Sequence, residues 1–179
     1  MTTKKLGTKD MAYVALGAAL LAICSWISIP TAVPFTLQTF AVFTVLSLLG
    51  GRRGTLSILI FILLGAFGVP VFSGFKGGFG VLLGATGGYI VGFLLTGLIY
   101  WGMTHLWKRT LIVEIIALVL GLAACYALGT AWFMTVYART SEAIGVMTAL
   151  GWCVFPFILP DLGKLVVGLI VARRVRPVL

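Results

Sequence analysis

Long apolar runs, separated by short polar or glycine-rich connections, make up almost the whole chain. A helix needs about 20 predominantly apolar residues to cross the hydrocarbon core of a bilayer. Prolines, paired glycines and basic pairs mark where the runs end. The expected helices have the approximate bounds 10–28, 39–50, 55–68, 80–106, 111–137 and 161–175. The pattern therefore predicts an all-α integral membrane protein with six transmembrane helices.

Composition supports this interpretation. Of the 179 residues, 61% are hydrophobic and 9% are charged, and the mean hydropathy is +1.18. These values exclude a soluble domain. The length leaves room for about five to seven spans of roughly 20 residues each. We therefore expect residues 1–179 to form a single domain that lies in the lipid bilayer, with the apolar run behind the basic start retained as the first helix.

The segment 143–159 is apolar, but prolines separate it from the last helix. As a further span, it would place the two chain ends on opposite sides of the membrane. With six spans, one side holds ten of the 13 basic residues. These are Lys4, Lys5, Lys9, Arg52, Arg53, Lys108, Arg109, Arg173, Arg174 and Arg176. The positive-inside rule therefore favours six spans with both termini cytoplasmic. The segment is then a re-entrant or capping element.

A glycine-rich stretch holds eight of the 23 glycines, between Gly74 and Gly92. Its first part, 73–80, should be a loop, and it carries the lone cation Lys76 between aromatic residues. From there Gly80, Gly84, Gly88 and Gly92 recur every four residues. On one helix they would form a face without side chains, open to a neighbouring helix or to a flat ligand. Both uses stay open for this face, as do stacking and packing for Tyr89 beside it.

The sequence P-D-L-G-K at 160–164 places two charges inside the last helix. Pro160 suits the first helical position, Asp161 the first turn, and Lys164 lies on the same face. At about 1.5 Å per residue, Asp161 lies about 18 Å from the cytoplasmic surface. A charge at such depth costs roughly 2.5–3.5 kcal/mol and needs a partner. The pair is either a structural salt bridge or, as we favour, a site for a urea-like or amide group.

Small residues on the first helix form two pairs with a spacing of four, Ala15 with Ala19 and Ala18 with Ala22. Such pairs let another helix approach closely. That helix could belong to this chain or to a partner subunit. Further along, His105 and Glu114 are expected to be interfacial or solvated groups at the cytoplasmic ends of their helices.

The sequence gives little support for ATP binding, hydrolysis, metal binding or nucleic-acid binding. The chain has no G-x-x-x-x-G-K-[ST] motif for ATP phosphates, and its four acidic residues and single histidine suggest neither hydrolysis nor a metal site. Cys24, Cys125 and Cys153 are expected to be buried thiols. The net charge of +9 is spread over the connections and indicates topology rather than nucleic acid. We expect no enzyme, no catalytic residues, no cofactor and no metal, and energy for any transport must come from a partner.

Three segments together resemble the BioY family, the substrate-binding S components of energy-coupling-factor biotin transporters. They are V-P-F-T-L-Q-T at 33–39, the glycine-rich stretch at 68–93, and F-P-F-I-L-P-D-L-G-K at 155–164. The likeness covers essentially the whole chain in order and spacing. One departure is Ala85, where the family commonly has proline in G-P-T-G-G-Y.

The resemblance implies a six-helix S-component fold in a prokaryotic cell membrane, with biotin held near the outer face. It implies that Asp161 and Lys164 meet the ureido ring and that Lys76 could meet the carboxylate. The other implied substrate contacts are Phe35, Gln38, Gly78, Gly84, Gly88 and Tyr89. In such transporters a membrane-spanning coupling subunit, which acts with two ATPases, docks on the alanine face of the first helix (Ala15, Ala18, Ala19, Ala22). The alternatives are an S component for another vitamin, a self-contained facilitator, and a purely structural membrane subunit.

Overall fold

The computed structural model describes residues 7–30, 33–139, 142 and 144–178. Lys4 and Lys5, which entered the charge count, and Ala143, which begins the expected capping segment, lie outside them. In chain order the elements are α1 (Thr8–Trp26), β1 (Ser28–Ile29), β2 (Phe35–Thr36), α2 (Gln38–Leu49), α3 (Gly51–Ala66), α4 (Phe79–Leu83), α5 (Gly87–Leu106), α6 (Leu111–Tyr137), α7 (Val146–Cys153), α8 (Phe155–Val175) and the 3₁₀ helix η1 (Arg176–Val178).

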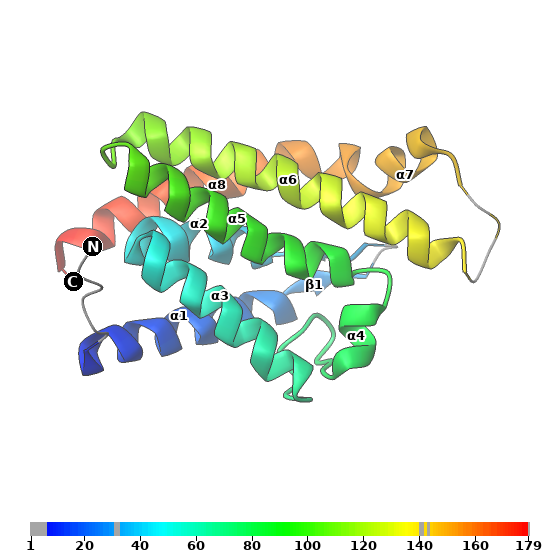
Figure 1. The fold of residues 1–179 in the computed structure, drawn as a ribbon, viewed down its shortest axis with the longest axis horizontal. Helices are drawn as coiled ribbons and strands as arrows, with labels where there is room; N and C mark the ends of the chain where they lie inside the picture. Colours follow the sequence, from blue (N-terminus) through cyan, green and yellow to red (C-terminus); the bar gives the residue numbers. More distant parts are fainter. Residues whose placement is uncertain (1–6, 31–32, 140–141, 143, 179) are drawn as a thin grey trace.

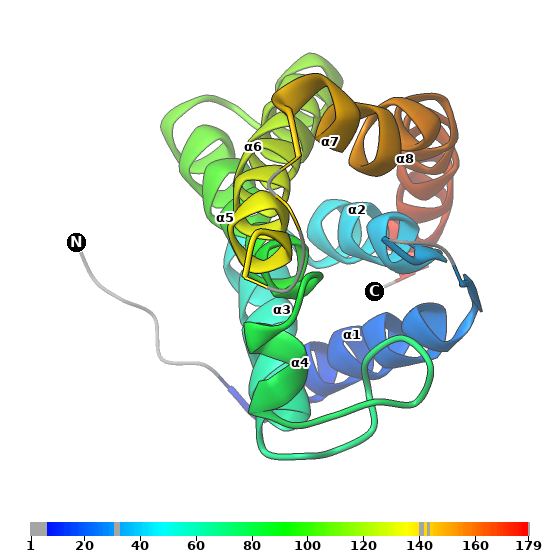
Figure 2. The ribbon, with the colours of Figure 1, turned by 90° about the vertical axis from the view of Figure 1, so that its right-hand side faces the viewer.

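The long helices run side by side along the longest axis of the molecule (Figure 1). Seen from the end, α2 lies inside, with α1, α5, α6 and α8 around it (Figure 2). Its residues Ala41 to Leu46 are all buried, as expected for a helix that is apolar on every side. α5 packs along α6, and α2 packs along α8. The core therefore forms around the shortest of the long helices.

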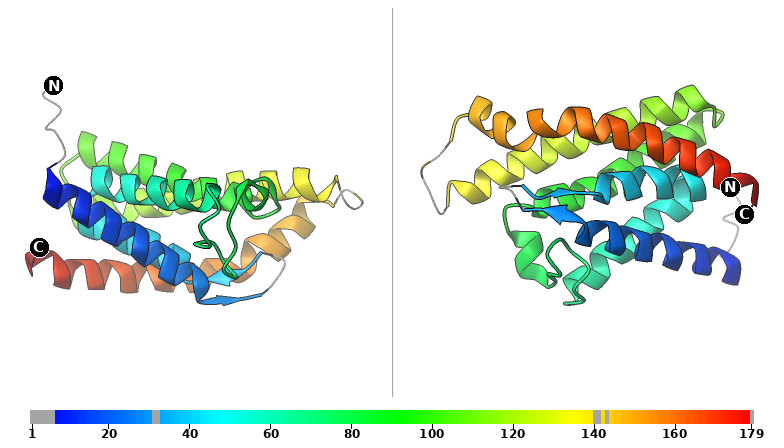
Figure 3. Two further views of the ribbon diagram at one scale, coloured as in Figure 1. Left: turned by 90° about the horizontal axis from the view of Figure 1, so that it is seen from below. Right: turned by 180° about the vertical axis from the view of Figure 1, so that it is seen from behind.

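Four stretches of the described chain are long and apolar enough to cross a membrane. They are α1, α5, α6 and the segment Val146–Val178, which comprises α7, α8 and η1, while α2 is a shorter apolar helix. The chain is thus a multi-pass membrane protein. The start of α1 and the end of η1 lie at the same end of the bundle (Figures 1 and 3).

The expected helix at 80–106 is wrong as a single element. α4 ends at Leu83, Gly84 continues with extended backbone, and α5 begins at Gly87. A side chain at Gly87 would collide with the carbonyl of Leu82, so the chain can fold back tightly here only without one. The four regularly spaced glycines therefore do not share one helix face.

The last helix also starts earlier than expected. α8 begins at Phe155, so Asp161 lies in its second turn and Pro160 lies inside the helix. The missing N–H of Pro160 leaves only the carbonyl of Pro156 without its helical donor, and Pro156 is exposed to its surroundings. Before α8, the short helix α7 packs against α6 and α8, separated from α8 by Val154.

The two alanine pairs of α1 face in different directions. Ala18 and Ala22 are buried against the rest of the bundle, whereas Ala15 and Ala19 are exposed. Only one pair therefore packs within this chain, and the other remains available on the outer surface of α1.

Candidate functional site

A cavity of about 450 Å³ is lined in part by the β hairpin and α4, which lie away from the chain ends in Figure 1. This volume falls in the range of small-molecule sites. The β hairpin and its loop, α2, the 67–78 loop, α4, α5, α6, α7 and α8 all contribute to its wall. The lining residues are Val33, Pro34, Thr36, Gln38, Thr39, Phe72, Ser73, Lys76, Gly80, Val81, Gly84, Ala85, Thr86, Tyr89, Ile90, Phe93, Leu122, Cys125, Tyr126, Cys153, Phe157, Asp161 and Lys164.

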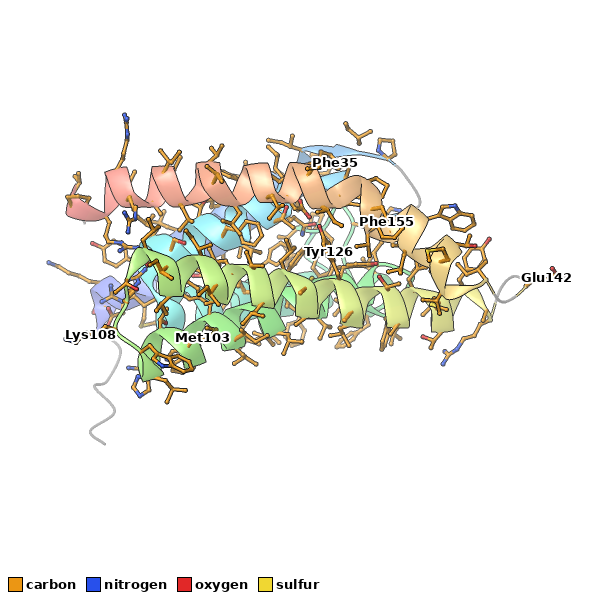
Figure 4. All side chains as sticks on the ribbon, turned by 90° about the horizontal axis from the view of Figure 1, so that it is seen from above. Phe35, Met103, Lys108, Tyr126, Glu142 and Phe155 are labelled. Carbon is orange, nitrogen blue, oxygen red and sulfur yellow. The ribbon has the colours of Figure 1, made fainter. Side chains whose placement is uncertain are left out.

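Asp161 accepts three side-chain hydrogen bonds in the cavity wall, and it is only 2% exposed. Its Oδ1 accepts from Lys164 Nζ at 2.9 Å and from Thr39 Oγ1 at 2.8 Å. Its Oδ2 accepts from the Tyr126 hydroxyl at 2.6 Å. The donors come from α8, α2 and α6, so one carboxylate ties three helices together at the cavity. Figure 4 shows Tyr126 between α6 and α8.

Lys164 connects α8 to the β hairpin. Its ammonium group donates to the carbonyl of Thr36 at 2.7 Å and lies 4.1 Å from the ring centroid of Phe35. The Phe35 ring in turn stacks on Phe157, with ring centroids 5.7 Å apart. Phe35 thus lies against Lys164 and is not itself among the residues that line the cavity.

Gln38, at the start of α2, presents an unused donor. The side chain is 6% exposed and lines the cavity. Its Oε1 accepts from Thr36 Oγ1 at 3.2 Å, but within the described residues its Nε2 has no partner. An unpaired buried amide nitrogen is costly, so this group suits a ligand acceptor.

The glycine-rich region contributes unevenly to the cavity. Gly84 lines it, and its carbonyl accepts from Trp132 Nε1 at 2.9 Å. Gly88 packs against Trp132 in α6 instead, and Gly78 precedes α4 without lining the cavity. Tyr89 lines the cavity with its ring packed on Gly129, while its hydroxyl lies 2.9 Å from Thr130 Oγ1.

Lys76 reaches the cavity from a loop that α1 holds in place. The backbone of Lys76 pairs with Phe72 across a turn in which Phe75 has a positive φ of 56°. Phe75 stacks on Trp26, and Trp26 Nε1 donates to the Pro70 carbonyl at 2.9 Å. The Lys76 side chain is exposed, and no ion pair to it occurs in the part of the chain that the structure describes.

Sequence reasoning missed Tyr126 and Thr39. Tyr126 sits in an apolar run with nothing nearby to connect it to Asp161, which lies 35 positions away. Thr39 belongs to the T-L-Q-T segment, whose polar residues were a usable signal. Both are recognised only when α2, α6 and α8 are brought together.

A second polar cluster, at the end near the chain termini, corrects the expectation for Glu114. This carboxylate is 1% exposed, not solvated. Its Oε1 accepts from Arg109 Nε at 2.7 Å, from Arg176 at 2.8 Å and from the Tyr100 hydroxyl at 3.0 Å. Both arginines also donate to the carbonyl of Ser47. Glu114 was misjudged because Arg176 reaches it from 62 positions away through the tertiary fold, while Arg109, five positions before it, turns inward to the same carboxylate.

Comparison with known proteins gives a consistent result along the full length. The model of the BioY family matches residues 1–179. "Biotin transporter BioY" of Thermotoga maritima is 41% identical over 159 residues, which cover 88% of this chain and 90% of the relative. "Probable biotin transporter BioY" of Pyrococcus horikoshii is 37% identical and covers 94% of this chain and 96% of the relative.

A solved structure agrees with the sequence matches. The crystal structure of the S component for biotin from an ECF-type ABC transporter superposes with a TM-score of 0.82 at 28% identity. The match covers 94% of this chain and 91% of the other.

Proposed function

This chain belongs to the BioY family, and on that premise we propose that it is the biotin-binding membrane subunit of a biotin uptake system. The names of its relatives and the likeness to a biotin S component support the substrate class. The observation that carries the proposal is the Asp161–Lys164 pair in the wall of a cavity of vitamin size.

The remaining hydrogen-bonding capacity of this pair matches a cyclic urea. Oδ1 of Asp161 already has two donors, but Oδ2 has only Tyr126 and can accept one more. Lys164 uses one N–H for Asp161 and one for Thr36, which leaves a third. A ureido N–H then donates to Oδ2, and the ureido carbonyl accepts from Lys164. The free amide N–H groups of Gln38 supply further donors.

The rest of biotin fits the other wall. The fused rings lie on apolar surface near Tyr89 and the open backbone at Gly84, and the valerate carboxylate meets Lys76. The Phe35 ring packs against the ammonium group of Lys164 from outside the cavity. Gly78 lies in the loop before α4 and Gly88 in the contact between α5 and α6, so neither touches the ligand.

Partners and orientation complete the proposal. The molecule crosses the membrane six times with both termini cytoplasmic, which the shared position of the two described ends supports. A coupling subunit of an energy-coupling-factor module docks on α1 and, with ATPase subunits, drives uptake. Its contact is the exposed pair Ala15 and Ala19, while Ala18 and Ala22 hold α1 in the bundle.

The test is titration of biotin into the purified chain, with thiamin and riboflavin as comparison ligands. We expect saturable binding of one biotin and no competition by the other two vitamins. Tighter binding of thiamin or riboflavin would instead make the chain an S component for a different vitamin. The absence of any vitamin binding would favour a structural subunit.

A further inference from the structure

A second cleft, of about 350 Å³, lies at the end of the molecule that carries both ends of the described chain. It is separate from the cavity around Asp161, and the two share no lining residue in the described part of the chain. The first turn of α1, the turn between α2 and α3, and the last turns of α5 form its walls. The residues that matter are Asp10, Arg52, Arg53, Trp101, His105 and Arg109.

The charges around the cleft do not cancel. Arg53 pairs with Asp10 and lies 5.5 Å from the ring centroid of Tyr13. Arg109 shares Glu114 with Arg176. Among the described residues, four arginines and two carboxylates therefore lie in and beside the cleft, a surplus of two positive charges before any contribution from His105. An anion is the ligand that this balance favours.

The position of the cleft indicates which class of anion it can bind. α1 and α5, whose ends form it, are both candidate membrane spans. Trp101, in the cleft wall, is 38% exposed, and Trp107 follows directly after α5. Tryptophan at the end of a span is typical of the headgroup level of a bilayer. The cleft thus opens where lipid headgroups lie, and basic pockets between membrane helices can bind anionic headgroups.

We propose that this cleft binds the phosphate group of an anionic phospholipid from the leaflet on the side of the chain ends. Arginine suits this role because its planar guanidinium donates paired hydrogen bonds to phosphate oxygens. Arg52 and His105 approach the headgroup from α3 and α5, and Trp101 contacts the glycerol and upper acyl region. A bound lipid then links α1, α3 and α5 at their ends and stabilises the folded chain.

The test measures thermal unfolding of the full chain in nanodiscs of phosphatidylcholine, with and without 30% phosphatidylglycerol. A ligand that binds only the folded state raises Tm, and we expect a rise of about 4 °C or more in phosphatidylglycerol. The variant Arg52→Gln with His105→Gln should lose at least half of that rise. Arg174→Gln is the matched control, because Arg174 is exposed at the same end but lies outside the cleft. It should keep the rise.

Only the lipid-dependent difference in Tm is compared, so a variant that is simply less stable does not mimic the result, and saturable biotin binding checks that each variant is folded. No rise in the unmodified chain, or an equal rise in the double variant, would overturn the proposal. An equal loss in Arg174→Gln would show general surface attraction and overturn it as well. Inorganic phosphate added to phosphatidylcholine discs tests whether a free anion can take the place of the lipid. A rise in Tm equal to that in phosphatidylglycerol would overturn the assignment to lipid.

Discussion

The hydroxyl of Tyr126 on α6 donates a 2.6 Å hydrogen bond to Oδ2 of Asp161 on α8, across 35 positions of sequence. This bond occupies one of the two acceptor sites on the oxygen that we assign to the ligand. Tyr126 therefore fixes the direction in which the remaining lone pair of Oδ2 points. On the proposed assignment, Tyr126 acts as a positioning residue for biotin through Asp161.

Tyr126→Phe should weaken biotin binding by about tenfold, because a hydrogen bond to a charged group contributes roughly 1.5–3 kcal/mol and only part of it concerns ligand orientation. Isothermal titration of the purified variant measures this. Thr135→Val on the same helix is the control, since its hydroxyl donates to the carbonyl of Trp132, one turn earlier, and the residue does not line the cavity. If Tyr126→Phe folds normally and binds biotin with unchanged affinity, Tyr126 does not position Asp161 for the ligand.

Asp161→Asn should weaken biotin binding by about one to two powers of ten, because the amide can turn a donor toward the ureido N–H. A purely structural salt bridge predicts something different: the single variants lose stability, and Asp161→Asn with Lys164→Met recovers both stability and binding. Biotin titrations and melting curves on both single variants and the double variant separate the two roles. Restored affinity in the double variant would refute the ligand site.

Ala19→Trp and Ala18→Trp form a matched pair on one helix. Ala19 is exposed, so the larger side chain should leave biotin binding of the isolated protein intact while uptake in cells falls through loss of the coupling subunit. Ala18 is buried, so its replacement should lower Tm and biotin binding together. Normal uptake with Ala19→Trp would show that the coupling subunit does not dock at this face of α1.

Glu114→Leu should reduce stability without touching the cavity. The change leaves Arg109 and Arg176 without their shared carboxylate. Loss of one partner of a buried pair costs about 3–5 kcal/mol, and we expect about 2 kcal/mol here because both arginines are partly exposed. Melting curves in detergent measure the loss, with the exposed Glu142→Gln as control. A variant as stable as the unmodified protein would show that the cluster is energetically neutral.

Single cysteines test the orientation. Cys24, Cys125 and Cys153 are buried, as expected, so they should contribute little background labelling. Arg174 and Glu142 are exposed, and Figure 4 places Glu142 at the end opposite Lys108. On intact cells a membrane-impermeant maleimide should label Glu142→Cys at once and Arg174→Cys only after lysis. The reverse pattern would invert the proposed topology.

Much of the helical framework could be predicted from the sequence. The expected bounds 111–137 coincide with α6, and α1 and α2 begin and end within two residues of expectation. Apolar runs and their polar ends determine such helices locally, because lipid requires every backbone group to bond within the segment. The spacing of Asp161 and Lys164 likewise predicted that the two side chains share a helix face, and the structure places them there as an ion pair.

Contacts between distant segments were decided only by the tertiary structure. Thr39 reaches Asp161 because α2 packs along α8, and Tyr126 reaches it from α6 across the cavity wall; no local pattern encodes these meetings. Tyr100 and Arg176 likewise meet Glu114 only in the folded chain. Packing of α1 against α2 and α3 turns one alanine pair inward and the other outward. The glycine series was misjudged for a related reason: its spacing permits one helix, but the chain folds back between Leu83 and Gly87 to close the cavity wall. Local spacing fixes which residues share a helix face, whereas the free energy of packing the helices decides what each face meets.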